Sequence, residues 1–128
     1  MQTPYLVAAI LSAVTGLVHS AFGEILIFRH LRNGSLVPAL GAPPLRERHV
    51  RIIWATWHLA TLFGWAFAGL LLQLALGHTM SASLVAGAIV FANLGGAVLV
   101  LVGTKGRHPG WIALSIVAAL TWLGAGAV

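Results

Sequence analysis

Two short segments carry the side chains that could do chemistry in this chain. The sequence HSAFGE occupies residues 19–24, and WH occupies residues 57–58. They supply two imidazoles and one carboxylate, from His19, His58 and Glu24, inside stretches that are otherwise apolar. Ionisable groups are costly within a bilayer and are retained mostly where a function uses them. These three residues are therefore the first candidates for a site.

Three kinds of chemistry fit this set of side chains. The first is a metal site, because two imidazoles and a carboxylate suit Zn, Fe, Mn or Cu. This is our leading interpretation, and the metal would serve a membrane redox step or transport. As axial ligands, His19 and His58 would hold haem b between two helices. As a proton relay, the same groups would need no metal, because imidazole titrates near neutrality.

A structural interpretation competes with all three. In it the protein binds no cofactor and is a structural or accessory membrane subunit, in which Glu24 is neutralised by His58 or by an arginine. The sequence has no nucleophile elbow, no phosphate-cradling glycine loop and no paired intramembrane carboxylates, so it identifies no catalytic residue. Whether the protein is an enzyme stays open.

Composition decides the class of protein. The 128 residues are 59 % hydrophobic and 7 % charged, with a mean hydropathy of +0.98. A soluble domain carries about 25 % charged residues, so a soluble enzyme, a disordered regulator and a nucleic-acid-binding domain are excluded. The absence of cysteine excludes disulfides and thiolate metal sites. The sequence indicates an integral membrane protein whose partner is the lipid bilayer and not nucleic acid.

Four apolar runs are long enough to cross the hydrocarbon core as helices, which takes about 20 residues. These runs cover residues 4–28, 52–76, 81–102 and 111–128. The predicted fold is all-α: a single transmembrane domain, residues 1–128, built as an up-down antiparallel four-helix bundle. Only the first connection, 29–51, is long. Its Pro- and Gly-rich centre is either an ordinary linker or a segment that lies along the interface or over the mouth of the bundle.

The basic residues predict the orientation. All of them lie in the first and third connections, and none lies in the second connection or at the termini. They are Arg29, Arg32, Arg46, Arg48, Arg51, Lys105 and Arg107. By the positive-inside rule both basic connections face the cytoplasm and both termini lie outside. We expect a multi-pass protein of the bacterial inner (plasma) membrane.

Helical spacing predicts how the candidate residues meet. His19, Glu24 and His58 fall at similar depths in the cytoplasmic half, on adjacent antiparallel helices. Around their own helix, however, His19 and Glu24 are separated by about 140°. Both reach one atom only if the Glu24 side chain bends back or if Gly23 loosens the helix. Arg51 is a second candidate partner for the carboxylate.

One face of the second span carries polar and aromatic side chains around His58. That face holds Arg51, Trp54, His58, Thr61 and Trp65. We expect Arg51 and Thr61 to support the site from behind its ligands, and His108 to lie near its mouth. Trp54 is interpreted as an aromatic residue of the membrane interface.

Small residues are dense in the third and fourth spans. Ala92 and Gly96, for example, form a small-xxx-small pair that lets helices approach closely. We expect these spans to pack within the chain, or against a second copy of it or a partner membrane subunit.

The motifs together resemble those of a family of small four-span bacterial inner-membrane proteins. The matching segments are HSAFGE at 19–24, WH at 57–58 and RHPGW at 107–111, and the resemblance spans nearly the whole chain. It implies the four-helix architecture and a His/Glu site, and it implies no reaction.

The RHPGW segment also resembles the Arg-His-Pro-x-aromatic motif of membrane methyltransferases that act on isoprenylcysteine or phospholipid. In that family the motif belongs to an S-adenosylmethionine site completed by a cytoplasmic segment after the last span. Because this chain ends at Val128, within or just beyond its fourth span, we expect RHPGW to mark a helix start instead. Pro109 then lies in the first turn and Trp111 at the interface.

Overall fold

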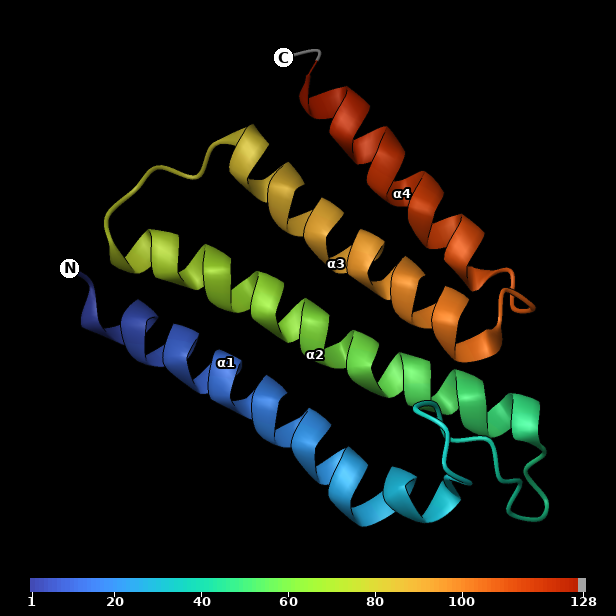
Figure 1. The fold of residues 1–128 in the computed structure, drawn as a ribbon. Helices are drawn as coiled ribbons and strands as arrows, with labels where there is room; N and C mark the ends of the chain where they lie inside the picture. Colours follow the sequence, from blue (N-terminus) through green and yellow to red (C-terminus); the bar gives the residue numbers. More distant parts are fainter. Residues whose placement is uncertain (127–128) are drawn as a thin grey trace.

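The computed structural model describes residues 1–126, and every regular element in that range is helical. Helices α1, α2, α3 and α4 cover Thr3–Phe22, Glu47–Ala75, Ala82–Thr104 and Gly110–Ala125 (Figure 1). The first helix continues through a π-helical turn, η1 (Gly23–Ile27), and a 3-10 turn, η2 (Phe28–Leu31). The predicted all-helical character is confirmed.

Three helical segments are long and apolar enough to cross a membrane. They are residues 3–31, α2 and α3. Helix α4 is equally apolar but has 16 residues, which corresponds to about 24 Å of helix against a hydrocarbon core of about 30 Å. The predicted end of the fourth span at Val128 lies outside the described residues.

Local residue choices set the helix ends. Ser81 caps the start of α3, where its hydroxyl accepts a hydrogen bond from the Leu84 N–H at 3.2 Å. At the other end of α3, Lys105 and Gly106 both adopt positive φ angles, of 54° and 73°, and reverse the chain into α4. Gly77, with φ 77°, similarly reverses the chain two residues after the end of α2. These reversals make consecutive helices antiparallel.

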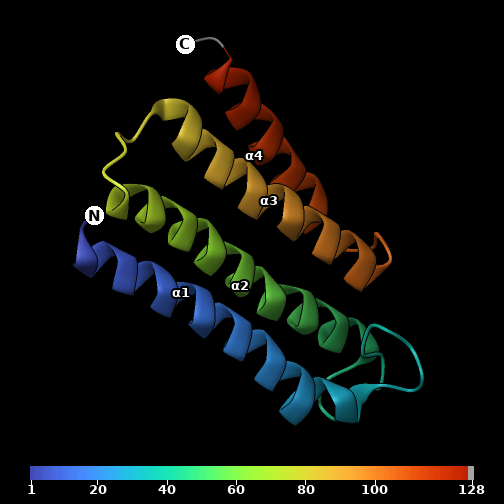
Figure 2. The same cartoon turned by 60° about the vertical axis from the view of Figure 1, so that its left-hand side comes forward.

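The four helices lie side by side in sequence order, with α1 and α4 at opposite edges (Figures 1 and 2). Within residues 1–126, the extensive contacts between α-helices join consecutive ones: α1 with α2, α2 with α3, and α3 with α4. The up-down order is as predicted, but the helices form an open layer rather than a closed bundle. The edge helix α4 keeps large apolar side chains exposed, including Leu120, Trp122 and Leu123. In a bilayer such a face meets lipid tails without penalty.

The first connection differs from its predicted limits of 29–51. The helical run from α1 ends at Leu31, and α2 begins at Glu47, five residues earlier than the hydropathy indicated. This added start of the helix is rich in charged residues, and it is stabilised across four residues by the bond that Arg51 Nε donates to Glu47 Oε1 at 2.8 Å. Arg51 is consequently a helical and buried residue, with 8 % of its surface exposed.

The middle of this connection folds back against the helices. The backbone N–H groups of Ala39 and Leu40 both donate to the Leu31 carbonyl, each at 2.9 Å. Val37 thereby joins a buried cluster that includes Phe28 and Trp54. The packed core thus gathers at the end of the layer where the chain passes from η2 to α2.

The fold brings both basic connections to one end of the helix layer, with the N-terminus and the last turn of α4 at the opposite end (Figure 1). Reporter fusions at residues 40 and 107 should therefore give the same side of the membrane, and a fusion at residue 79 the other. Signals from opposite sides at 40 and 107 would contradict this arrangement.

Candidate functional site

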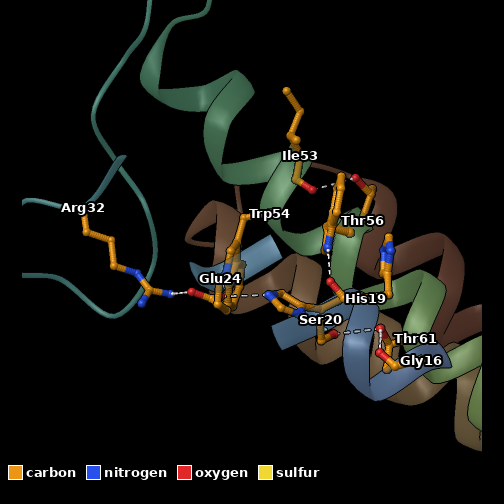
Figure 3. Close-up of polar contacts among 11 residues, drawn as sticks. Gly16, His19, Ser20, Glu24, Arg32, Ile53, Trp54, Thr56 and Thr61 are labelled. Atoms are coloured by element: carbon orange, nitrogen blue, oxygen red, sulfur yellow. Dashed lines mark hydrogen bonds and ion pairs between the residues drawn. The ribbon is translucent and has the colours of Figure 1, made fainter. Parts of the chain in front are cut away.

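Glu24 is the centre of the polar contacts between the end of the first helical run and α2 (Figure 3). Its Oε1 accepts a hydrogen bond from Trp54 Nε1 at 2.6 Å and lies 2.9 Å from His58 Nε2. Its Oε2 forms an ion pair with Arg32, which lies at the start of the first connection. A carboxylate among apolar side chains must be paired or protonated. Here three nitrogen groups surround it.

The π-helical turn η1 turns Glu24 toward α2. Such turns insert an extra residue into a helix and are frequent at functional sites. Gly23, where η1 begins, is buried and lies against the Trp57 indole. A Cβ atom at this position would lie 2.2 Å from Trp57 Nε1, so a residue with a side chain does not fit without moving the indole. Gly23 therefore permits the close approach of α1 and α2 that the Glu24 contacts require.

His58 uses both ring nitrogens. While Nε2 contacts Glu24, Nδ1 lies 2.8 Å from the Ser20 hydroxyl. Ser20 Oγ lies 2.7 Å from Thr61 Oγ1, which donates to the Gly16 carbonyl at 3.0 Å. These contacts form one continuous chain between α1 and α2, from the carboxylate of Glu24 to the backbone of Gly16 (Figure 3).

The Gly16 carbonyl, the last acceptor in this chain, determines which atom donates in each hydrogen bond. A carbonyl only accepts, so Thr61 spends its single hydroxyl proton on Gly16. Ser20 must then donate to Thr61, which leaves His58 Nδ1–H as the donor to Ser20. With Nδ1 protonated, the remaining contact needs one proton placed between His58 Nε2 and Glu24 Oε1.

Two distributions of that proton satisfy the contact. Either an imidazolium faces a carboxylate, or a neutral imidazole accepts from a carboxylic acid. In both, the pair formed by Glu24 and His58 carries no net charge, which is the condition for holding such groups among apolar side chains.

His19 lies apart from this pair. Its ring stacks on the Trp57 indole, with ring centroids 4.4 Å apart and planes at 7°. Trp57 Nε1 donates to the His19 carbonyl at 2.9 Å, and His19 Nε2 is buried without a hydrogen-bond partner in residues 1–126. The π-helical turn begins after His19 and reorients Glu24 alone, so loosening at Gly23 does not bring the two side chains together.

The predicted metal triad of His19, Glu24 and His58 is therefore not assembled. Over the part of the chain that the structure describes, no three His, Asp or Glu residues are grouped closely enough to hold a metal ion. The predicted haem pair meets a similar obstacle, because both nitrogens of His58 are already bonded to Ser20 and Glu24. Ligation by His58 would displace one of these partners. Metal and haem binding stay predictions that this geometry does not support.

Of the three residues predicted to support the site, only one contacts it. Thr61 belongs to the hydrogen-bond chain, whereas Arg51 instead bonds to Glu47 and to the Gly103 carbonyl, at 2.8 and 3.0 Å. The His108 ring accepts locally from the Gly110 N–H and lies in a different cavity.

The interpretation of Trp54 as an aromatic residue of the membrane interface is wrong. Only 8 % of its surface is exposed, and its indole N–H bonds to Glu24. An indole ring can be buried when its N–H finds an acceptor. Gly103 makes room for the ring, since a Cβ there would meet Trp54 at 3.3 Å.

Sequence reasoning also missed Ser20 and Arg32. Ser20 could have been found, because Gly16, Ser20 and Glu24 recur every fourth residue and so share one face of α1. Arg32 follows the end of the helical run, in a segment without periodicity. Its position depends on how the connection folds back, and no spacing rule predicts that.

A cavity of about 330 Å³ lies at the far end of the hydrogen-bond chain. Gly16 and Thr61 line it together with Ser12, Thr15 and His19. The chain of hydroxyls and imidazole therefore connects Glu24, whose side chain is 28 % exposed, with a mostly apolar hollow between α1 and α2.

No protein-family model, curated protein or solved structure matches this chain. The resemblance to small four-span bacterial membrane proteins stays a prediction.

The close approach at Gly23 is testable by adding a single methyl group. Gly23→Ala should destabilise the fold by about 1–3 kcal/mol, because the new Cβ overpacks against Trp57. Thermal unfolding in detergent, followed by tryptophan fluorescence, measures this. Gly69→Ala is the matched control, since a Cβ at that helical position meets nothing within 4 Å. Equal stability of the two variants would show that α1 and α2 do not depend on this contact.

Proposed function

We propose that the protein is a small polytopic membrane protein in which the Glu24–His58 pair binds a proton and relays it along α1 and α2. One observation carries this proposal: His58 bridges a carboxylate and a hydroxyl with its two ring nitrogens, at 2.9 and 2.8 Å. Imidazole takes up and releases protons near neutral pH. A histidine held in this way can accept a proton on one nitrogen and release one from the other.

The relay begins at the carboxylate. A proton arriving from the end with the basic connections binds to Glu24, which is partly exposed beside Arg32. The Nδ1 proton of His58 then passes to Ser20 Oγ, and the Ser20 proton passes to Thr61 Oγ1. Thr61 in turn releases its proton to water or a base in the adjoining cavity. One proton enters and one leaves, and reorientation of the hydroxyls and of the imidazole proton restores the starting state.

The direction of the relay follows from the proposed sidedness. We place both basic connections in the cytoplasm of a bacterial cell, and both termini outside, from the positive-inside rule. Glu24 then lies at the cytoplasmic end of the hydrogen-bond chain, and the cavity beside Gly16 and Thr61 lies deeper in the membrane. On this placement the site exchanges protons with the cytoplasm through Glu24.

A structural or accessory role is the second candidate, and a different set of contacts favours it. Trp65 Nε1 donates to the Ala13 carbonyl at 3.1 Å, and Ser12 Oγ donates to the Gly64 carbonyl at 2.9 Å. Interhelical hydrogen bonds of this kind fasten helices in a membrane. In this alternative the Glu24–His58 pair only completes the fastening of α1 to α2.

Proton flux separates the two roles. In vesicles that contain the purified protein and a pH-sensitive dye, an imposed potential should drive proton uptake. Glu24→Gln keeps the side-chain volume but removes the proton-accepting carboxylate, so flux should fall by about a hundredfold, the lower end of the contribution typical of a positioned proton-transfer group. His58→Gln should act similarly.

Trp65→Phe is the matched control, because it breaks an α1–α2 hydrogen bond outside the relay. Its flux should match that of the unmodified protein, and circular dichroism should show all variants helical. Flux no greater than in empty vesicles, or unchanged flux in a folded Glu24→Gln variant, would contradict the relay. A stoichiometric transition metal that is lost in His58→Leu would favour the metal site instead.

A further inference from the structure

A strongly basic cavity of about 730 Å³ lies at the end of the helix layer, between the first turn of α2 and the turn that joins α3 to α4. It is separate from the Glu24–His58 pair, neither of which lines it. Five of the seven Lys and Arg residues of the chain line it. They are Arg46, Arg48, Arg51, Lys105 and Arg107.

These cations lack sufficient counter-charge within the protein. The chain has only two acidic residues, and both are already paired: Glu24 with Arg32 and His58, and Glu47 with Arg51. In residues 1–126, the other four cations of the cavity form no ion pair with a carboxylate side chain. Like charges gathered in this way repel one another, and a bound anion would relieve that repulsion.

The walls of the cavity are held in place by the fold. Arg51 is buried and fixed by bonds to Glu47 and to the Gly103 carbonyl. On the opposite wall, Thr104 Oγ1 accepts from the His108 N–H at 3.3 Å and so braces the turn that carries Lys105. The first turn of α2 adds the partial positive charge of a helix N-terminus. Positive groups from two separate segments therefore face one preformed hollow.

We propose that this cavity binds the phosphate group of an anionic ligand. Guanidinium groups match phosphate oxygens with pairs of parallel hydrogen bonds, and three of the uncompensated cations are arginines. The position also fits the proposed membrane placement, because the cavity lies where the apolar parts of α2 and α3 end, and headgroups follow the hydrocarbon core at that level. Basic pockets at this level between transmembrane helices bind phospholipid headgroups. A lipid headgroup and a free phosphate share this chemistry, and the experiment distinguishes them.

Binding is measured by native mass spectrometry on the whole protein, released from phosphatidylcholine nanodiscs with and without phosphatidylglycerol. A separate titration adds inorganic pyrophosphate to the protein in phosphatidylcholine alone. Arg107→Gln and Arg46→Gln should each weaken binding by at least about tenfold, because each removes charge-assisted hydrogen bonds to phosphate. Arg29→Gln is the matched control: it removes one exposed positive charge from the same end of the molecule, outside the cavity.

Each outcome of these experiments either supports or contradicts the proposed phosphate site. Retention of phosphatidylglycerol without binding of pyrophosphate supports the site and assigns it to a lipid headgroup. Binding of pyrophosphate in phosphatidylcholine supports the site and assigns it to a soluble phosphate. If neither probe binds, the proposal is wrong. It is also wrong if Arg29→Gln weakens binding as much as Arg107→Gln, because the attraction would then be diffuse rather than local.

Discussion

The contact between Glu24 and His58 sets the conditions that the surrounding structure meets. An ionised side chain costs about 2.5–3.5 kcal/mol at the centre of a membrane helix on insertion scales, and a pair with no net charge avoids much of that cost. The π-helical turn aims the carboxylate at α2, and Gly23 lets the helices approach. The first connection folds back and supplies Arg32. The turn, the glycine and the folded connection each help to bring a polar or positively charged partner to the Glu24 carboxylate.

The same fold divides the positive charge of the protein between two tasks. Arg32 pairs with Glu24 at the packed end of the layer, while five other cations line a cavity at its rim. A protein with only two acidic residues cannot pair all of its cations internally. Four of the cations that have no carboxylate partner within residues 1–126 lie where an anion from outside can reach them: Arg46, Arg48, Lys105 and Arg107. In our account, proton exchange and anion binding occupy the same end of the molecule but use different residues.

The sequence predicted the helices, their antiparallel order and the meeting of Glu24 with His58, because hydropathy and helical depth depend on local spacing. It did not predict the exclusion of His19, since a stacked indole and the place of a π-helical turn depend on packing between helices. Trp54 was misinterpreted because burial of an indole depends on an acceptor from another segment. The open layer was also missed, because apolar helices in lipid have no hydrophobic need to close.

The shared proton is the central claim, and the ring nitrogens of His58 report it most directly. Nitrogen-15 solid-state NMR of the histidine-labelled protein in lipid bilayers, with His58 assigned by its loss in His58→Gln, gives the protonation of each nitrogen. We predict a proton on Nδ1, donated to Ser20, and a second proton shared between Nε2 and Glu24. A neutral His58 with a bare Nδ1 and its only proton on Nε2 would contradict the account.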